Sequence, residues 1–100
     1  MELDRTFGPT YGAGQTLSVT DTSQVVTFGR RNWAFTVTNL GADVAYVRTG
    51  TGSITATTAD YPVLPLSQVS LSKVYDDDRL AAVCATGDST SLHIIPGEGI

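Results

Sequence analysis

The chain has very few of the side chains on which most enzyme chemistry depends. Its 100 residues include one Cys, one His and one Lys. A single cysteine, Cys84, excludes an internal disulfide and any zinc site built from several cysteines. For catalysis His93 would need a nucleophile or a carboxylate beside it, and the sequence contains no Gly-x-Ser-x-Gly motif. We therefore predict no catalytic, cofactor-binding or metal-binding residues.

Charge and long apolar runs are also scarce. Charged residues make up 16% of the chain, and the formal net charge of −4 argues against binding to nucleic-acid phosphates. No apolar run approaches the roughly 20 residues that cross a membrane. The first five residues lack the apolar region of a signal peptide. The sequence therefore predicts neither a nucleic-acid nor a membrane partner.

Hydroxyl and β-branched side chains are abundant instead. The chain has 15 Thr and 8 Ser, and Thr and Val favour a pleated, half-buried strand over a helix. Its length fits one domain. Glycines and a proline within residues 1–15 predict an irregular N-terminal arm. Residues 16–100 are predicted to form a single domain.

Short alternating runs between turn residues predict about seven or eight strands. The clearest is 33–38, which places Trp33, Phe35 and Val37 on one face. The continuous apolar run within 79–85 predicts a buried strand, and the two prolines of 61–66 predict an edge strand or connecting chain. Pro96 is expected to end the last strand, 90–95. The predicted fold is all-β, a small antiparallel β-sandwich or jelly roll. Its predicted core consists of Trp33, Phe35, Val37, Val69, Leu71, Leu80, Val83, Leu92 and Ile94.

Two polar or aromatic features have alternative interpretations. The carboxylates of residues 76–78 could bind calcium, but they lack the spacing of an EF-hand loop, and a solvated turn is the favoured interpretation. Four tyrosines would suit either a sugar-binding platform or a protein interface, and the sequence does not separate the two. These are Tyr11, Tyr46, Tyr61 and Tyr75.

Large apolar residues on irregular segments indicate a binding surface. They occur in the arm and within residues 54–66, where exposing them to water is costly unless a partner covers them. We expect the apolar C-terminal residues 94–96 to lie outside the core as well. The predicted partner-binding residues are Phe7, Tyr11, Tyr61, Val63, Leu64 and Leu66.

Four segments carry a resemblance to a known class of proteins: 37–41 (VTNLG), 44–50 (VAYVRTG), 56–65 (ATTADYPVLP) and 92–99 (LHIIPGEG). Over residues 16–99 the chain resembles small virion proteins of tailed bacteriophages, in particular capsid decoration or cement proteins. The resemblance implies a non-enzymatic homo-oligomer, a dimer or trimer. It would bind the major capsid protein on the outside of the expanded head and stabilise the shell.

The resemblance also implies a location on the capsid surface of the virion, after synthesis in the cytoplasm of the host bacterium. An unpaired Cys84 fits synthesis in that reducing compartment. Two other functions remain open at this point. One is a tail, fibre or head–tail accessory protein, and the other is a carbohydrate-binding β-sandwich module.

Overall fold

A computed structural model of the chain describes residues 8–28, 32–73 and 75–98. These residues form nine strands and no helix, and every strand pair is antiparallel. The strands are β1 (Gly8–Pro9), β2 (Gln15–Val19), β3 (Gln24–Thr27), β4 (Ala34–Asn39), β5 (Ala45–Gly50), β6 (Tyr61–Val63), β7 (Gln68–Ser72), β8 (Arg79–Cys84) and β9 (Thr90–Glu98).

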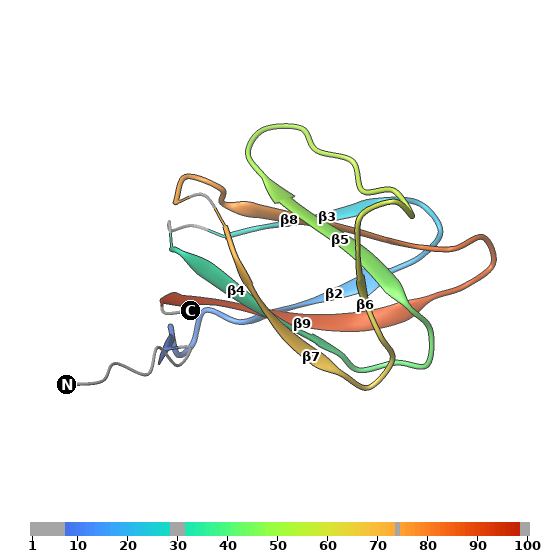
Figure 1. Cartoon of the computed structure of the whole chain (residues 1–100), viewed down its shortest axis with the longest axis horizontal. Coiled ribbons are helices and arrows are strands. Elements are labelled where there is room, and N and C mark those ends of the chain that lie inside the picture. The colour runs from blue at the N-terminus through green and yellow to red at the C-terminus, as the bar shows by residue number, and fades with distance from the viewer. Residues whose placement is uncertain (1–7, 29–31, 74, 99–100) are drawn as a thin grey trace.

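The strands form two sheets that pack face to face (Figure 1). One sheet has the order β2-β9-β4-β7, with β1 beside the far end of β9, and the other has the order β3-β8-β5-β6. From β2 to β9 the chain changes sheet at every connection except β5 to β6. Eight strands in this order form a jelly roll. The predicted all-β sandwich is thus confirmed.

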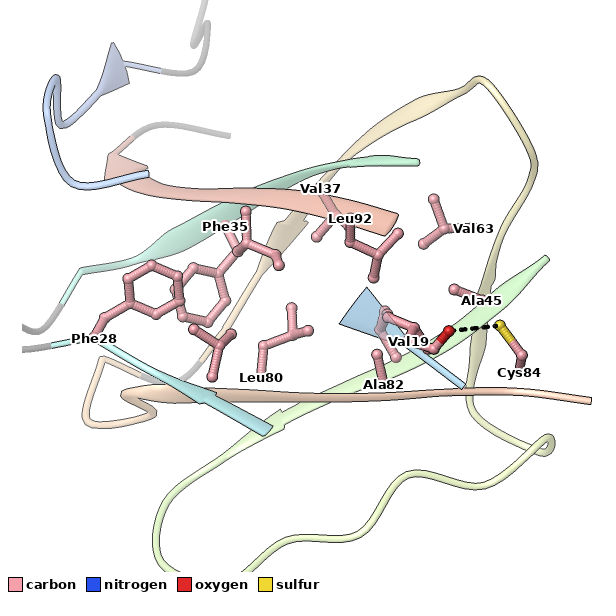
Figure 2. Close-up of a cluster of buried hydrophobic side chains, with 13 residues drawn as sticks. Val19, Phe28, Phe35, Val37, Ala45, Val63, Leu80, Ala82, Cys84 and Leu92 are labelled. Atoms are coloured by element: carbon pink, nitrogen blue, oxygen red, sulfur yellow. Dashed lines mark hydrogen bonds between the residues drawn. The ribbon is translucent and has the colours of Figure 1, made fainter. Parts of the chain in front are cut away.

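The main core lies between the two sheets (Figure 2). Phe28 and Phe35 face each other across it with ring centroids 5.0 Å apart. Of the predicted core residues, Phe35, Val37, Leu80, Leu92 and Ile94 are fully buried there, and Val69 and Leu71 pack against them from β7. The alternation of apolar and polar residues along each strand produces this core, because successive side chains point to opposite faces.

Strand β8 is buried on both faces, which explains its continuous apolar sequence. Leu80, Ala82 and Cys84 point into the main core, whereas Ala81 and Val83 belong to a second, smaller cluster. Ile54 and Ala56, from the β5–β6 loop, belong to the same cluster and cover the outer face of the sheet. Small side chains on β8 allow this close double packing. The predicted buried strand is confirmed, and Val83 is buried on the outer face.

Three predictions need correction. Trp33 is 54% exposed because it precedes β4, beyond the edge of the core. Strand β9, which was expected to end at Pro96, continues to Glu98. Residues Ile94 and Pro96, which were expected to lie outside the core, are buried. The proline fits because only every second residue of β9 forms backbone hydrogen bonds with β4. Pro96 is not one of them, so the position of its missing N–H faces the arm. There the carbonyl of Pro96 accepts a hydrogen bond from the Thr10 N–H (2.9 Å).

The described part of the arm is attached to the domain. Strand β1 pairs with the C-terminal end of β9, and β2 already begins at Gln15. Between them the chain leaves the ladder for a turn at Tyr11 and Gly12. Gly14 then lies so close to His93 that a Cβ atom there would approach its Nε2 to 2.6 Å, so any other residue would require the His93 ring to move.

Candidate docking surface

Three exposed leucines gather at one end of the sandwich. Leu40 follows β4 and is 53% exposed, while Leu64 (59%) and Leu66 (80%) lie in the connection from β6 to β7. We call these three residues the leucine end. Exposed leucines scattered singly are ordinary, but three on two adjoining connections form an apolar surface of the kind that proteins use to bind other proteins. Leu64 and Leu66 were predicted as partner-binding residues, and Leu40 was not.

Asn39 holds both connections of the leucine end in place. Its side chain is 1% exposed, and its Nδ2 donates to the carbonyls of Val63 (3.0 Å) and Asp43 (2.8 Å). Its Oδ1 accepts from the Gly41 N–H (3.0 Å) and the Thr90 hydroxyl (2.7 Å). These four partners use the full capacity of the amide. They also fix its orientation, because a flipped amide would place its oxygen against two carbonyls.

The same residue fixes both ends of the β6–β7 connection. The Asn39 side chain bonds to Val63 at its start, and the Asn39 backbone N–H donates to the Ser67 carbonyl (2.8 Å) at its end. The Ser67 hydroxyl in turn donates to the Leu64 carbonyl (2.6 Å). Leu40 is held next to them by its own N–H, which donates to the Ser91 carbonyl (2.8 Å). The leucine end is therefore preorganised by hydrogen bonds, of which the Asn39–Val63 bond is fully buried.

The backbone of Leu66 has an unfavourable conformation. Its φ of 56° is in the left-handed region, which Gly and Asn adopt readily and a leucine rarely does. Among the described residues it is the one non-glycine with a positive φ. Backbone outliers of this kind cluster at binding and active sites, where surrounding structure maintains them. Here the hydrogen bonds of Asn39 and Ser67 flank the outlier and present an exposed leucine.

The structure separates the remaining predicted partner residues. Tyr61, 50% exposed, lies on edge strand β6 two residues before Val63. Val63 is fully buried in the core, so it is removed from the predicted surface (Figure 2). Tyr11, 87% exposed, follows β1, which pairs with the C-terminal end of β9, whereas Asn39 lies opposite Leu92 near the other end of β9. The arm and the leucine end therefore lie at opposite ends of the sandwich, as the course of β9 in Figure 1 shows. Phe7 lies outside the described residues.

An aromatic pair occupies that opposite end. The rings of Trp33 and Tyr75 have centroids 4.9 Å apart and planes tilted by 44°, and both side chains are roughly half exposed. Neighbouring Lys73 places its ammonium group 4.9 Å from the centre of the Phe35 ring. Partial burial lowers the pKa of Lys73, and the carboxylates of Asp77 and Glu98 oppose that shift. Hydrophobic periodicity assigned Trp33 to the core, so the pairing of Trp33 with Tyr75 was not predicted.

The titratable groups of the described residues lie on strands and connections of both sheets. No group of three His, Cys, Asp or Glu side chains there could hold a metal ion. In the acidic turn, Asp77 accepts a hydrogen bond from the Thr49 hydroxyl (3.2 Å). Cys84 is buried, and burial together with nearby carboxylates raises the pKa of its thiol. The described residues also include no helix long and apolar enough to cross a membrane.

No protein-family model, no curated protein and no solved structure matches this chain. The jelly roll, the leucine end and the aromatic pair are therefore the features from which a function is inferred.

Proposed function

We propose that this chain is a non-enzymatic structural protein of a tailed-bacteriophage virion, a decoration protein that binds the outside of the expanded capsid. The observation that carries the proposal is the leucine end, three exposed leucines held on two connections by one buried asparagine. Covering an exposed leucine with a partner removes apolar surface from water, and this burial favours binding. A preorganised loop loses little conformational entropy when it binds.

Two further considerations support a capsid partner. The sequence resembles small phage virion proteins over residues 16–99, and the jelly roll is an architecture that viral structural proteins use often. The fold by itself does not define a function, since lectins use it as well. A decoration protein that binds the expanded shell and not its precursor stabilises the expanded state by mass action. Many copies on one shell make even a weak contact effective.

The proposal is tested by co-sedimentation with capsids. Purified protein is mixed with expanded heads of the phage that encodes it, and with unexpanded proheads as the comparison. We expect saturable binding to expanded heads only, with a stoichiometry that identifies the symmetry axis occupied. Replacing Leu40 and Leu64 by Ser should weaken this binding at least about tenfold, because covering a half-exposed leucine contributes on the order of 1 kcal/mol.

The control is Tyr11→Ser, which removes a large and even more exposed side chain from the opposite end of the domain. It should leave binding unchanged. Equal weakening by the leucine and tyrosine variants would show that the contact is not at the leucine end. Binding to neither capsid form would contradict the decoration role and favour a tail, fibre or head–tail accessory protein.

The Trp33–Tyr75 pair favours one second candidate, carbohydrate binding. Exposed aromatic rings stack on sugar faces, but planes tilted by 44° do not make one flat platform. Trp33 is the one tryptophan of the chain, so its fluorescence reports directly on this pair. A glycan that quenches or shifts this fluorescence saturably, with loss of the effect in Tyr75→Ala, would establish the second candidate.

A further inference from the structure

Strand β7 is an edge strand with unusually little protection against pairing. It forms the outer border of its sheet beside β4, and its sequence, QVSLS, contains no charge, proline or glycine. An edge of this kind presents unpaired backbone groups to solvent, and proteins usually block such edges with lysine, proline or a covering segment. The other three edges of this sandwich are less open, since one carries a proline and the other two are joined to each other and to β8 by hydrogen bonds.

Strand β6, the edge of the opposite sheet, carries Pro62. Strands β2 and β3 lie at the remaining edges, and they are linked to each other and to β8. The Gln15 side chain donates to the Thr27 carbonyl (2.9 Å), and the Cys84 N–H donates to the Thr20 carbonyl (2.8 Å). Lys73 follows β7, but its ammonium bonds to the carbonyl of Asn32 and lies over the Phe35 ring, so it points inward.

The register of the sheet shows which backbone groups of β7 point outward. Residues of β4 and β7 that face each other have numbers that sum to 106, and bonds from the Lys73 N–H to the Trp33 carbonyl and from the Asn39 N–H to the Ser67 carbonyl follow this register. Odd-numbered residues of β7 therefore bond to β4. Because bonding direction alternates along an antiparallel strand, the N–H and C=O groups of Gln68, Ser70 and Ser72 point to the open edge.

We propose that β7 pairs antiparallel with β7 of a second copy of this chain, about a two-fold axis at Ser70. In this register Ser70 of one copy faces Ser70 of the other, and Gln68 of each copy faces Ser72 of the other. Each of these three pairs exchanges two backbone bonds, so every outward group of the strand finds a partner. A two-fold interface requires such self-complementarity, in which one patch serves both copies.

The side chains fit the same axis. Val69 would face Leu71 of the second copy on the inner face, where both are partly buried and packed against the core. The outer face carries the hydroxyl of Ser70, which already bonds to the Thr36 hydroxyl (2.8 Å). Two copies would therefore extend this row of hydroxyls across the axis without opposing like charges. The pairing is independent of capsid binding, because the leucine end is not part of it.

The proposal is tested first by sedimentation equilibrium of the full chain without capsids, over a wide concentration range. We expect a monomer–dimer equilibrium and a weak dimer, since one pair of short strands buries less than the roughly 1,200 Å² of a standard stable interface. Ser70→Pro should raise the dimer dissociation constant by about tenfold or more, because it removes two backbone donors across the axis. The fold should survive, since this N–H does not bond to β4.

The register is tested by cross-linking. In Ser70→Cys the two cysteines face each other with Cα atoms about 5.5 Å apart, within the range that a disulfide spans. Ser72→Cys is the matched control. Both serines are exposed on the same face, but the two copies of residue 72 would be about 14 Å apart along the strands. Native Cys84 is buried and does not compete.

Under mild oxidation we expect a covalent dimer from Ser70→Cys and little from Ser72→Cys. A wild-type chain that remains a monomer at every concentration would overturn the proposal and leave this edge to a strand of another protein. Equal cross-linking of both variants would overturn the register. Both results are independent of capsid binding, so they are distinguishable from a failure of the proposed function.

Discussion

Replacing Asn39 tests whether one buried amide maintains the leucine end. In Asn39→Ala the carbonyls of Val63 and Asp43 lose their donor, and the Gly41 N–H and Thr90 hydroxyl lose their acceptor. The bond to Val63 is fully buried, and a buried group left without a partner costs about 1–3 kcal/mol. The other three bonds are partly buried, and each contributes about 0.5–1.5 kcal/mol.

Together these terms predict a loss of about 5 kcal/mol in the free energy of unfolding. A domain of this size is stable by about 5–15 kcal/mol, so the variant loses a large part of its stability. The melting temperature should fall by about 20 °C, since each kcal/mol shifts it by roughly 4–8 °C in a domain of this length. Urea unfolding followed by circular dichroism measures the effect. Gln68→Ala, which removes one exposed side-chain hydrogen bond to Thr38, should change stability by less than about 0.5 kcal/mol.

Asn39→Asp separates hydrogen bonding from packing, because it keeps the shape of the side chain. At neutral pH its carboxylate would face two carbonyl oxygens, so it should destabilise the fold at least as much as Asn39→Ala. This environment raises the pKa of the introduced carboxyl in the folded state above its unfolded value. Stability should therefore increase as the pH falls through that raised pKa. An Asn39→Asp variant as stable as the wild type at neutral pH would refute the arrangement described for this amide.

Three further predictions concern other parts of the domain. Leu66→Gly should raise the free energy of unfolding by up to about 1 kcal/mol, because glycine adopts a positive φ readily, and it should weaken capsid binding. A loss of stability in urea unfolding would contradict the strain assigned to the Leu66 backbone. Ile54→Ala should lower the free energy of unfolding by about 1–2 kcal/mol, whereas replacing the exposed Thr55 by Ala should not lower it. Equal effects of the two variants in urea unfolding would mean that the β5–β6 loop does not cover β8. Cys84 should react with Ellman's reagent only as fast as the protein unfolds, because the thiol is buried and its pKa is raised. Rapid labelling of the native protein would disprove this burial.

The strands and most of the core could be predicted from the sequence. Successive residues of a strand point to opposite faces, so apolar residues that alternate with a period of two indicate which side chains face the core. The β8 run was identified because a strand covered on both faces loses that alternation. Trp33 was misplaced by the same rule, since it has the parity of Phe35 but precedes the strand. Periodicity gives the face of a residue and not the point where the sheet ends.

The candidate surface could be predicted only in part. The apolar residues around the two prolines of 61–66 indicated Leu64 and Leu66, and the structure leaves both exposed. Leu40 was missed because it is more than 20 residues away along the chain, and only the hydrogen bonds of Asn39 bring the two connections together. Asn39, two residues before Gly41, suggests a turn, but the hydrogen bonds of its side chain to β6 and β9 depend on the order of the strands. One sequence does not contain that order.

The two proposals together predict how a dimer would bind a capsid. Antiparallel pairing at Ser70 places the two leucine ends on opposite sides of the axis, with their Leu66 residues about 27 Å apart along the paired strands. Such a dimer could contact two neighbouring capsid subunits at once, and its second contact would form at a high effective concentration. Disulfide-linked Ser70→Cys should therefore bind expanded heads at least about a hundredfold more tightly than the reduced, dilute monomer. Equal affinities in co-sedimentation would mean that only one leucine end of a dimer reaches the capsid, and that the dimer does not bridge subunits.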